Sequence, residues 1–160
     1  MRLPVEFLIE KYKDNIYSAA YNVCGDPQDA EDITQETFIK YYRRNEDFES
    51  EEHVKAWLLR VAINQAKSMA VSFWRRNRVS IQEYMAELAF EAPEDAELFE
   101  AVMALPQKYR IVVHLHYFED YSVKEMAEVL KTSENTIKTR LARGRKLLKE
   151  RLKEAWNEYE

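Results

Sequence analysis

The sequence predicts an all-α protein made of two small helical domains joined by an acidic linker. Its 160 residues include only two glycines and four prolines, with 46% hydrophobic and 33% charged residues. This composition is typical of helices with short connections. Apolar residues also recur at helical spacing in two blocks of the chain. Between the blocks the spacing weakens and acids accumulate, so we expect domains over 1–78 and 100–160 with a linker over 79–99.

The first domain is expected to be a bundle of three helices. Apolar residues at helical spacing from Val5 predict a first helix that ends at Gly25. Asp26 suits the capping position of a second helix and Pro27 suits its first turn. This helix continues to about residue 44. A third helix is expected from about Glu51, and its apolar side consists of Val54, Trp57, Leu58, Val61, Ala62 and Met69.

The second domain is expected to contain a helix-turn-helix. A helix starts at Leu105-Pro106, and a short helix follows with Ser122 and Glu125 as its capping box. Thr132 or Ser133 caps the last helix. Its core side is formed by Ile137, Leu141, Leu148 and Leu152, and its outward side by Lys138, Thr139, Arg143, Lys146 and Lys149.

Charge is strongly segregated although the formal net charge is only −5. Residues 131–153 contain nine Lys or Arg and two Glu, and residues 60–78 contain five bases and no acid. Residues 83–100 contain seven acids and no base. Two basic surfaces separated by an acidic interval indicate two contacts with nucleic acid. A basic helix behind a short partner helix is how many proteins bind the DNA major groove. The alternative for both runs is a solvated helix face.

Two separated blocks carry a resemblance to a known family. DAEDITQETFIKYYRR and WLLRVAINQAKSM resemble region 2 of bacterial sigma-70 family initiation factors. LPQKYRIVVHLHYFEDYSVKEMAEVLKTSENTIKTRLARGRKLL resembles region 4 of the same proteins. The order of the blocks and the absence of region 3 resemble the extracytoplasmic-function (ECF) group. The resemblance implies a sigma factor that directs core RNA polymerase to specific promoters, without catalysis or a cofactor of its own.

The resemblance also implies functional residues in the first domain. Its second helix would dock on the β′ clamp of core polymerase, at positions matching Asp32, Gln35, Glu36, Arg43 and Arg44. Its third helix and the following loop would recognise and help to melt the −10 element, at Asn64, Lys67, Ser68, Trp74, Arg75 and Arg76. An amide such as that of Asn64 offers a donor and an acceptor to a flipped base. Trp74 either stacks on a base or packs in the core.

In the second domain the last helix would read the −35 element. Lys138, Thr139 and Arg143 match base-facing positions, and Thr136, Arg140, Arg145 and Lys146 match positions that contact phosphates. The family also implies contact with the β flap of polymerase and control by an anti-sigma factor. Two departures stand out here. Lys131 replaces a glycine that is frequent in the turn, so we expect this turn to avoid a positive φ. Gly144 replaces a common alanine at about 1 kcal/mol of helix propensity.

Other functions remain as alternatives. An ordinary helix-turn-helix regulator would form a dimer and bind a palindrome without polymerase, and an interaction module would bind only an acidic protein. An enzyme has little support, since the chain lacks phosphate-loop, G-x-S-x-G and H-E-x-x-H motifs. His114 and His116 point to different helix faces, so no metal site is expected. A lone Cys24, no membrane-spanning run and early acids predict a cytoplasmic protein.

Overall fold

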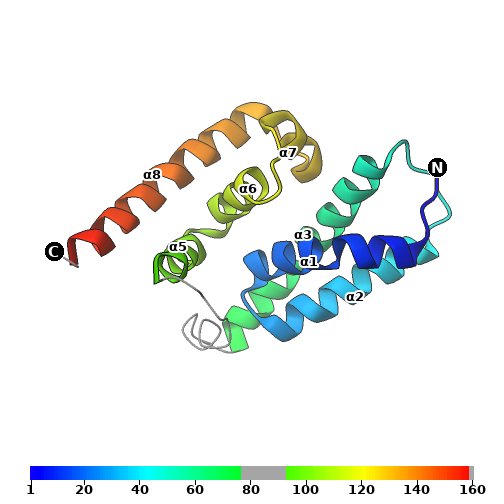
Figure 1. The fold of residues 1–160 in the computed structure, drawn as a ribbon, viewed down its shortest axis with the longest axis horizontal. Helices are drawn as coiled ribbons and strands as arrows, with labels where there is room; N and C mark the ends of the chain where they lie inside the picture. Colours follow the sequence, from blue (N-terminus) through cyan, green and yellow to red (C-terminus); the bar gives the residue numbers. More distant parts are fainter. Residues whose placement is uncertain (77–92, 159–160) are drawn as a thin grey trace. The chain divides into compact units, whose positions relative to one another are not determined.

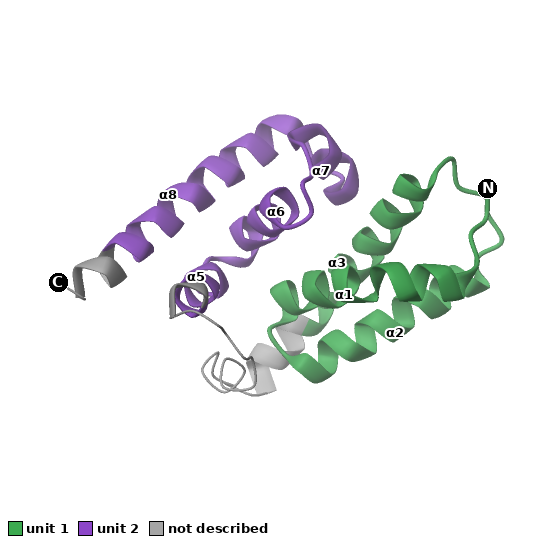
Figure 2. Cartoon of the chain, in the orientation of Figure 1, with its two compact units in different colours: residues 1–78 green, residues 79–160 purple. Residues whose placement is uncertain are grey.

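The prediction of an all-α fold is confirmed in the residues that the computed structural model describes. These are residues 1–76 and 93–158, and the side chains described are those of residues 1–69 and 96–153. The chain divides into two compact units, Met1–Arg78 and Val79–Glu160 (Figure 2). Seven α-helices lie in the described residues (Figure 1). They are α1 (Val5–Cys24), α2 (Pro27–Arg43), α3 (Glu51–Arg76), α5 (Pro93–Met103), α6 (Gln107–Tyr117), α7 (Val123–Leu130) and α8 (Glu134–Glu158).

The first unit is a three-helix bundle in which α1 packs against both α2 and α3 (Figure 1). The predicted boundary between α1 and α2 is confirmed in detail. Gly25 ends α1 in the left-handed region at φ 71°, where a glycine has no steric penalty. The Asp26 carboxylate then accepts the Asp29 backbone N–H at 2.8 Å and Pro27 opens α2. This abrupt turn sets α2 back along α1.

The end of α2 is fixed by contacts with the first residues of the chain. The Arg2 guanidinium donates to the backbone carbonyls of Tyr41 and Tyr42 in the last turn of α2, where intrahelical partners run out. The Tyr41 hydroxyl donates to the Leu3 carbonyl at 2.6 Å. Tyr41 also stacks on Phe48, the buried aromatic residue of the loop before α3. Backbone and aromatic contacts together therefore hold this end of the bundle.

Cys24 is a core residue of the first unit. Its side chain is fully buried, and burial raises the pKa of its thiol to about 11. A thiol with this pKa remains protonated at neutral pH and is a poor nucleophile. The burial therefore favours a core role for Cys24 over a role as a reactive thiol.

The first described helix of the second unit starts where part of the linker was expected. Residues 79–92 of the predicted linker lie outside the described residues, and α5 starts at Pro93, inside the 79–99 segment. Proline suits the first turn of a helix and acids near its N-terminus interact favourably with the helix dipole. The sequence Pro93-Glu94-Asp95 therefore fits a helix start as well as a linker.

The helix-turn-helix has the caps that its sequence predicts. The Ser122 hydroxyl accepts the Glu125 backbone N–H, and the Glu125 carboxylate accepts the Ser122 backbone N–H, both at 3.1 Å. Of the two candidates for the next cap, Ser133 is the one used, since its hydroxyl accepts the Thr136 backbone N–H at 3.1 Å. These caps fix where α7 and α8 begin.

The turn between α7 and α8 differs from its prediction. Lys131 has φ 51°, so the expectation that the turn avoids a positive φ is wrong. The Lys131 N–H reaches the Ala127 carbonyl and ends α7 in the left-handed conformation. A residue with a Cβ pays about 1 kcal/mol or more for this conformation, and glycine does not. The need to end a helix within three residues outweighs that strain.

We therefore expect Lys131→Gly to raise the free energy of unfolding of the second unit by about 1 kcal/mol, because the exposed side chain contributes little and the strain is removed. Denaturant unfolding followed by circular dichroism measures the change. Lys131→Ala is the matched control, since it removes the same charge but keeps the Cβ. An equal gain from alanine would contradict the role of the backbone conformation.

Gly144 lies where α8 crosses α6. A Cβ added at this position would lie 3.0 Å from Val113 Cγ2 and 3.4 Å from Tyr109 Cβ. The Val113 distance is tighter than nearly all real Cβ contacts, so the Val113 side chain would have to shift by a few tenths of an ångström to admit a side chain at position 144. The propensity lost by a glycine in a helix is thus offset by a closer packing of α6 on α8.

Candidate nucleic-acid interface

One face of α8 is basic and exposed. Ile137, Leu141 and Gly144 are buried and hold the helix on the rest of its unit. On the opposite side lie the exposed residues Lys138, Thr139, Ala142, Arg143, Lys146 and Lys149. The predicted outer side of this helix is confirmed, and of the predicted inner residues Ile137 and Leu141 are buried whereas Leu148 and Leu152 are half-buried. A convex row of cations on a helix that follows a tight turn suits insertion into a DNA groove.

The predicted phosphate contacts of α8 have different surroundings. Thr136 is half-buried, and its hydroxyl lies 2.8 Å from the Ser133 hydroxyl within the cap. Arg140 is half-buried as well, whereas Lys146 is exposed. Thr139 donates its hydroxyl proton to the Asn135 carbonyl at 3.0 Å, so its oxygen is left as an acceptor. Lys146 is therefore the freest of these side chains for an external anion.

Two arginines of α8 interact with tyrosines of α6. A hydrogen bond with Arg143, together with the nearby charge of Lys108, lowers the pKa of the Tyr109 hydroxyl. On the other side of Gly144, Arg145 Nε donates to the Tyr117 hydroxyl, and its guanidinium carbon lies 5.4 Å from the Tyr117 ring centroid. The two arginines that flank the helix crossing are therefore both held by aromatic side chains.

The two histidines of α6 have separate environments. His114 stacks on Phe118 at 4.9 Å, and burial lowers the pKa of its imidazole to about 4. His116 lies with Nδ1 2.9 Å from the Tyr121 carbonyl. Across residues 1–69 and 96–153, no group of three His, Cys, Asp or Glu side chains is arranged to hold a metal ion.

On α3, the predicted −10 residues are described only in part. Asn64 and Ser68 are exposed one helical turn apart, and Lys67 beside them is half-buried. The Ser68 hydroxyl donates to the backbone carbonyl of Asn64 at 3.4 Å, and not to its side chain. The side-chain amide of Asn64 is therefore exposed to solvent without a bond to Ser68. Trp74, Arg75 and Arg76 belong to the last turn of α3, and their side chains lie outside the described residues.

The predicted polymerase-binding residues of α2 fall into two groups. Asp32 and Gln35 are exposed, and Glu36 is half-buried. Arg43 is exposed beside them, but Arg44 pairs with Glu46 and lies over the Trp57 ring, 5.2 Å from its centroid. Arg44 therefore supports the loop of its own unit, and Arg43 is the arginine available to a partner.

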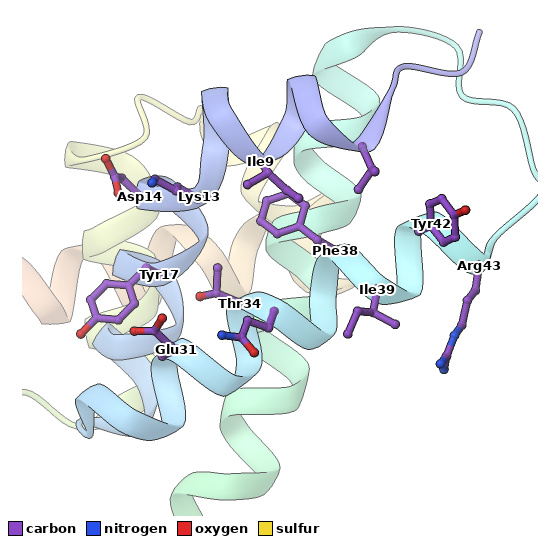
Figure 3. A pocket seen from close by; sticks show the side chains of 12 residues that line it. Ile9, Lys13, Asp14, Tyr17, Glu31, Thr34, Phe38, Ile39, Tyr42 and Arg43 are labelled. Carbon is purple, nitrogen blue, oxygen red and sulfur yellow. The ribbon is translucent and has the colours of Figure 1, made fainter.

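A groove of about 850 Å³ lies between α1 and α2 (Figure 3). It is lined by Val5, Ile9, Lys13, Asp14, Tyr17, Glu31, Thr34, Gln35, Phe38, Ile39, Tyr42 and Arg43. Three of these are large apolar side chains that remain exposed: Ile9 at 39%, Ile39 at 42% and Tyr42 at 69%. Helical spacing from Val5 and Leu8 would favour a buried Ile9, so its exposure is not explained by the sequence pattern. Exposed apolar side chains gathered in a groove mark a surface for a protein partner.

Fold and site together indicate the class of helix-turn-helix proteins, with a basic face on α8 and a separate apolar groove on the first unit. Sequence profiles of Sigma-70 region 2 and Sigma-70 region 4 match residues 8–79 and 95–148. The ECF RNA polymerase sigma factor SigW of Bacillus subtilis is 30% identical over 92% of this chain and 88% of its own. The RNA polymerase sigma-H factor of Pseudomonas aeruginosa is 30% identical over 89% and 83%. The chain belongs to the ECF group of sigma-70 family RNA polymerase sigma factors.

Solved structures agree on the fold. The sigma factor RpoE of Bartonella quintana, in complex with the anti-sigma factor NepR, has a TM-score of 0.72 at 21% identity over 92% of this chain and 96% of its own. CnrH, in complex with the cytosolic domain of CnrY, has a TM-score of 0.70 at 24% identity over 93% and 87%. These likenesses concern the fold alone.

Membership of this family distinguishes between the alternative functions that the sequence allows. The protein is a sigma factor that recognises promoters together with RNA polymerase, and it is not an enzyme. The family therefore does not support the hypotheses of an independent dimeric regulator and of a pure interaction module. Within the two described ranges, none of the helices combines the length and the apolar character needed to cross a bilayer.

Proposed function

We propose that the first unit binds core polymerase through the α1–α2 groove and contacts the −10 element through α3, while α8 reads the −35 element. The observation that carries this proposal is the presence of two different surfaces on two units. The groove offers exposed Ile39 and Tyr42 beside Gln35, a mixture typical of protein interfaces. The α8 face offers Lys138 and Arg143 and is built for an anion.

The groove suits the β′ clamp better than it suits nucleic acid. Its charged residues include both signs, with Asp14 and Glu31 negative and Lys13 and Arg43 positive. Asp32 and Gln35 lie on the same helix and are exposed. A phosphate backbone would be repelled by these acids, whereas a protein helix with basic and apolar side chains would be attracted. The resemblance implies that the β′ clamp of core polymerase supplies such a helix.

Two further partners follow from the relatives. The B. quintana RpoE and CnrH structures each contain a partner protein, NepR in one and the cytosolic domain of CnrY in the other. We expect this chain to be held by an anti-sigma factor in the same way, and its second unit to contact the β flap of polymerase. The chain would act in the cytoplasm, because promoter DNA and polymerase are there.

Transcription reconstituted with purified bacterial core polymerase and a library of promoter sequences tests the proposal. The expected result is selective initiation on templates that share two conserved elements, one near −35 and one near −10. Core polymerase alone is the control. The proposal fails if the chain does not bind core polymerase, or if the selected templates share only one element.

We expect Asn64→Ala to slow promoter opening by roughly 10-fold or more, because a base hydrogen-bonded by an amide contributes about 1–3 kcal/mol of recognition. Permanganate reactivity of the opened strand measures opening, and footprinting upstream measures the −35 contact. Upstream contact should change little. Asn45→Ala, at another exposed asparagine of the same unit, is the matched control. Equal loss of both contacts would point to misfolding instead.

A further inference from the structure

Arg145 is held by two side chains of α6 that have no assigned role. Its Nε donates to the Tyr117 hydroxyl, and its Nη2 lies 3.3 Å from His116 Nε2. The guanidinium also lies over the Tyr117 ring, with 5.4 Å between its carbon and the ring centroid. All three groups are near the surface, and Tyr117 is 56% exposed. Three contacts on one exposed arginine are more than core packing requires.

The protonation of His116 follows from its neighbours. A backbone carbonyl can only accept a hydrogen bond, and the Tyr121 carbonyl lies 2.9 Å from His116 Nδ1. Nδ1 therefore carries the proton, and in the neutral ring Nε2 is an acceptor. An acceptor is what the Arg145 Nη2 donor needs. The chain of contacts thus runs from the α6–α7 turn through His116 to the recognition helix.

These contacts use only one edge of the guanidinium. Nε–H and one N–H of Nη2 lie along the same side, and they are the two donors bonded to Tyr117 and His116. A guanidinium has five N–H donors, so three remain, on Nη1 and Nη2 at the tip. A planar pair of donors at the tip matches two oxygens of a phosphate. Arg145 is therefore held along its side with its tip available.

We propose that His116 and Tyr117 are positioning residues that aim the tip of Arg145 at a phosphate of promoter DNA. This inference rests on the proposed reading of DNA by α8. A long arginine side chain loses rotamer freedom when it binds, and fixing it beforehand removes most of that loss. The exposed Lys146 beside it has no comparable support among the described contacts, so the two cations differ in how far they are pre-ordered.

The test is a double-mutant cycle on the complex of this chain with core polymerase. Binding to a duplex promoter carrying the selected −35 element is followed by fluorescence anisotropy over a series of KCl concentrations. Arg145→Ala should lower the slope of log K against log salt by about one, since one phosphate contact is lost. Tyr117→Phe keeps the ring but removes the hydroxyl, and it should weaken binding roughly threefold to tenfold.

Coupling between the residues decides the result. In the Arg145→Ala background, Tyr117→Phe and His116→Ala should have no further effect on binding, because the group that they position is gone. Lys153→Ala removes one exposed charge from the same helix and is the control for charge alone. Additive effects in the double variants, or an unchanged salt slope for Arg145→Ala, would overturn the proposal and leave Arg145 as a purely structural contact.

The outcome is separable from that of the proposed function. If the unmodified chain does not direct polymerase to any promoter, the proposed function fails before the cycle begins. If it does so and the three residues act independently, only their positioning role is lost. Thermal unfolding of each variant shows whether the second unit is intact, and the high exposure of Tyr117 makes loss of folding an unexpected cause.

Discussion

Replacing Lys138 and Arg143 together by alanine is expected to lower transcription from a cognate promoter by at least roughly 30-fold, while binding to core polymerase is unchanged. Both side chains are exposed on the outer face of α8, so their replacement removes the Arg143–Tyr109 hydrogen bond but no buried side chain. Lys and Arg donate well to guanine edges, and each good base contact contributes about 1–3 kcal/mol of discrimination. Two such losses combine on one helix, which explains the size of the effect.

The measurement is run-off transcription in vitro, with polymerase binding measured separately by pull-down of core enzyme. Lys149→Ala with Arg151→Ala is the matched control, because it removes two exposed charges from α8 nearer its C-terminus. The control should act mainly through the salt dependence of binding and much less on the choice of promoter. Normal transcription by the Lys138/Arg143 variant would show that α8 does not read bases at these positions.

The second large effect is expected in the α1–α2 groove. Ile39→Asp should weaken binding to core polymerase by roughly 30-fold or more. We expect Ile39 to be one of the few interface residues whose removal costs about 2 kcal/mol or more, and an unpaired carboxylate in its place adds a desolvation penalty. Because Ile39 is 42% exposed in the free chain, its replacement should leave the bundle itself folded.

Phe7→Asp is a close control for this variant. Phe7 is also 42% exposed and lies on α1, but it is not among the residues that line the groove. Calorimetric titration of each variant with core polymerase gives the two affinities. A selective loss for Ile39→Asp supports the groove as the docking surface. Equal losses, or none, would remove the groove from the proposal.

Local features of the fold could be predicted from the sequence because their causes are local. Gly25 and Asp26 end one helix and begin the next through backbone conformation and one short hydrogen bond. Ser122 and Glu125 satisfy each other across a single helical turn. The outward row on α8 follows in the same way from helical periodicity. Each of these depends on residues only a few positions apart.

The remainder depends on contacts between distant parts of the chain. The conformation of Lys131 reflects how sharply α7 must end before α8, which residue type alone does not reveal. The roles of His116 and Tyr117 require α6 and α8 to lie together, and the groove requires α1 beside α2. One signal is present in the sequence, since Ile39 and Tyr42 are large side chains that each follow a core residue of α2 directly in the chain.

At the crossing of α8 and α6 near Gly144, the residues that pack the recognition helix are different from the residues that face outward. The inner side of α8 packs closely on α6, since a Cβ at position 144 would lie only 3.0 Å from Val113 Cγ2. The outer positions are free of that restriction. New promoter preferences should therefore be obtainable by exchanging the outer residues alone, provided that the glycine is kept. Libraries built for that purpose would retain a folded scaffold in most of their members.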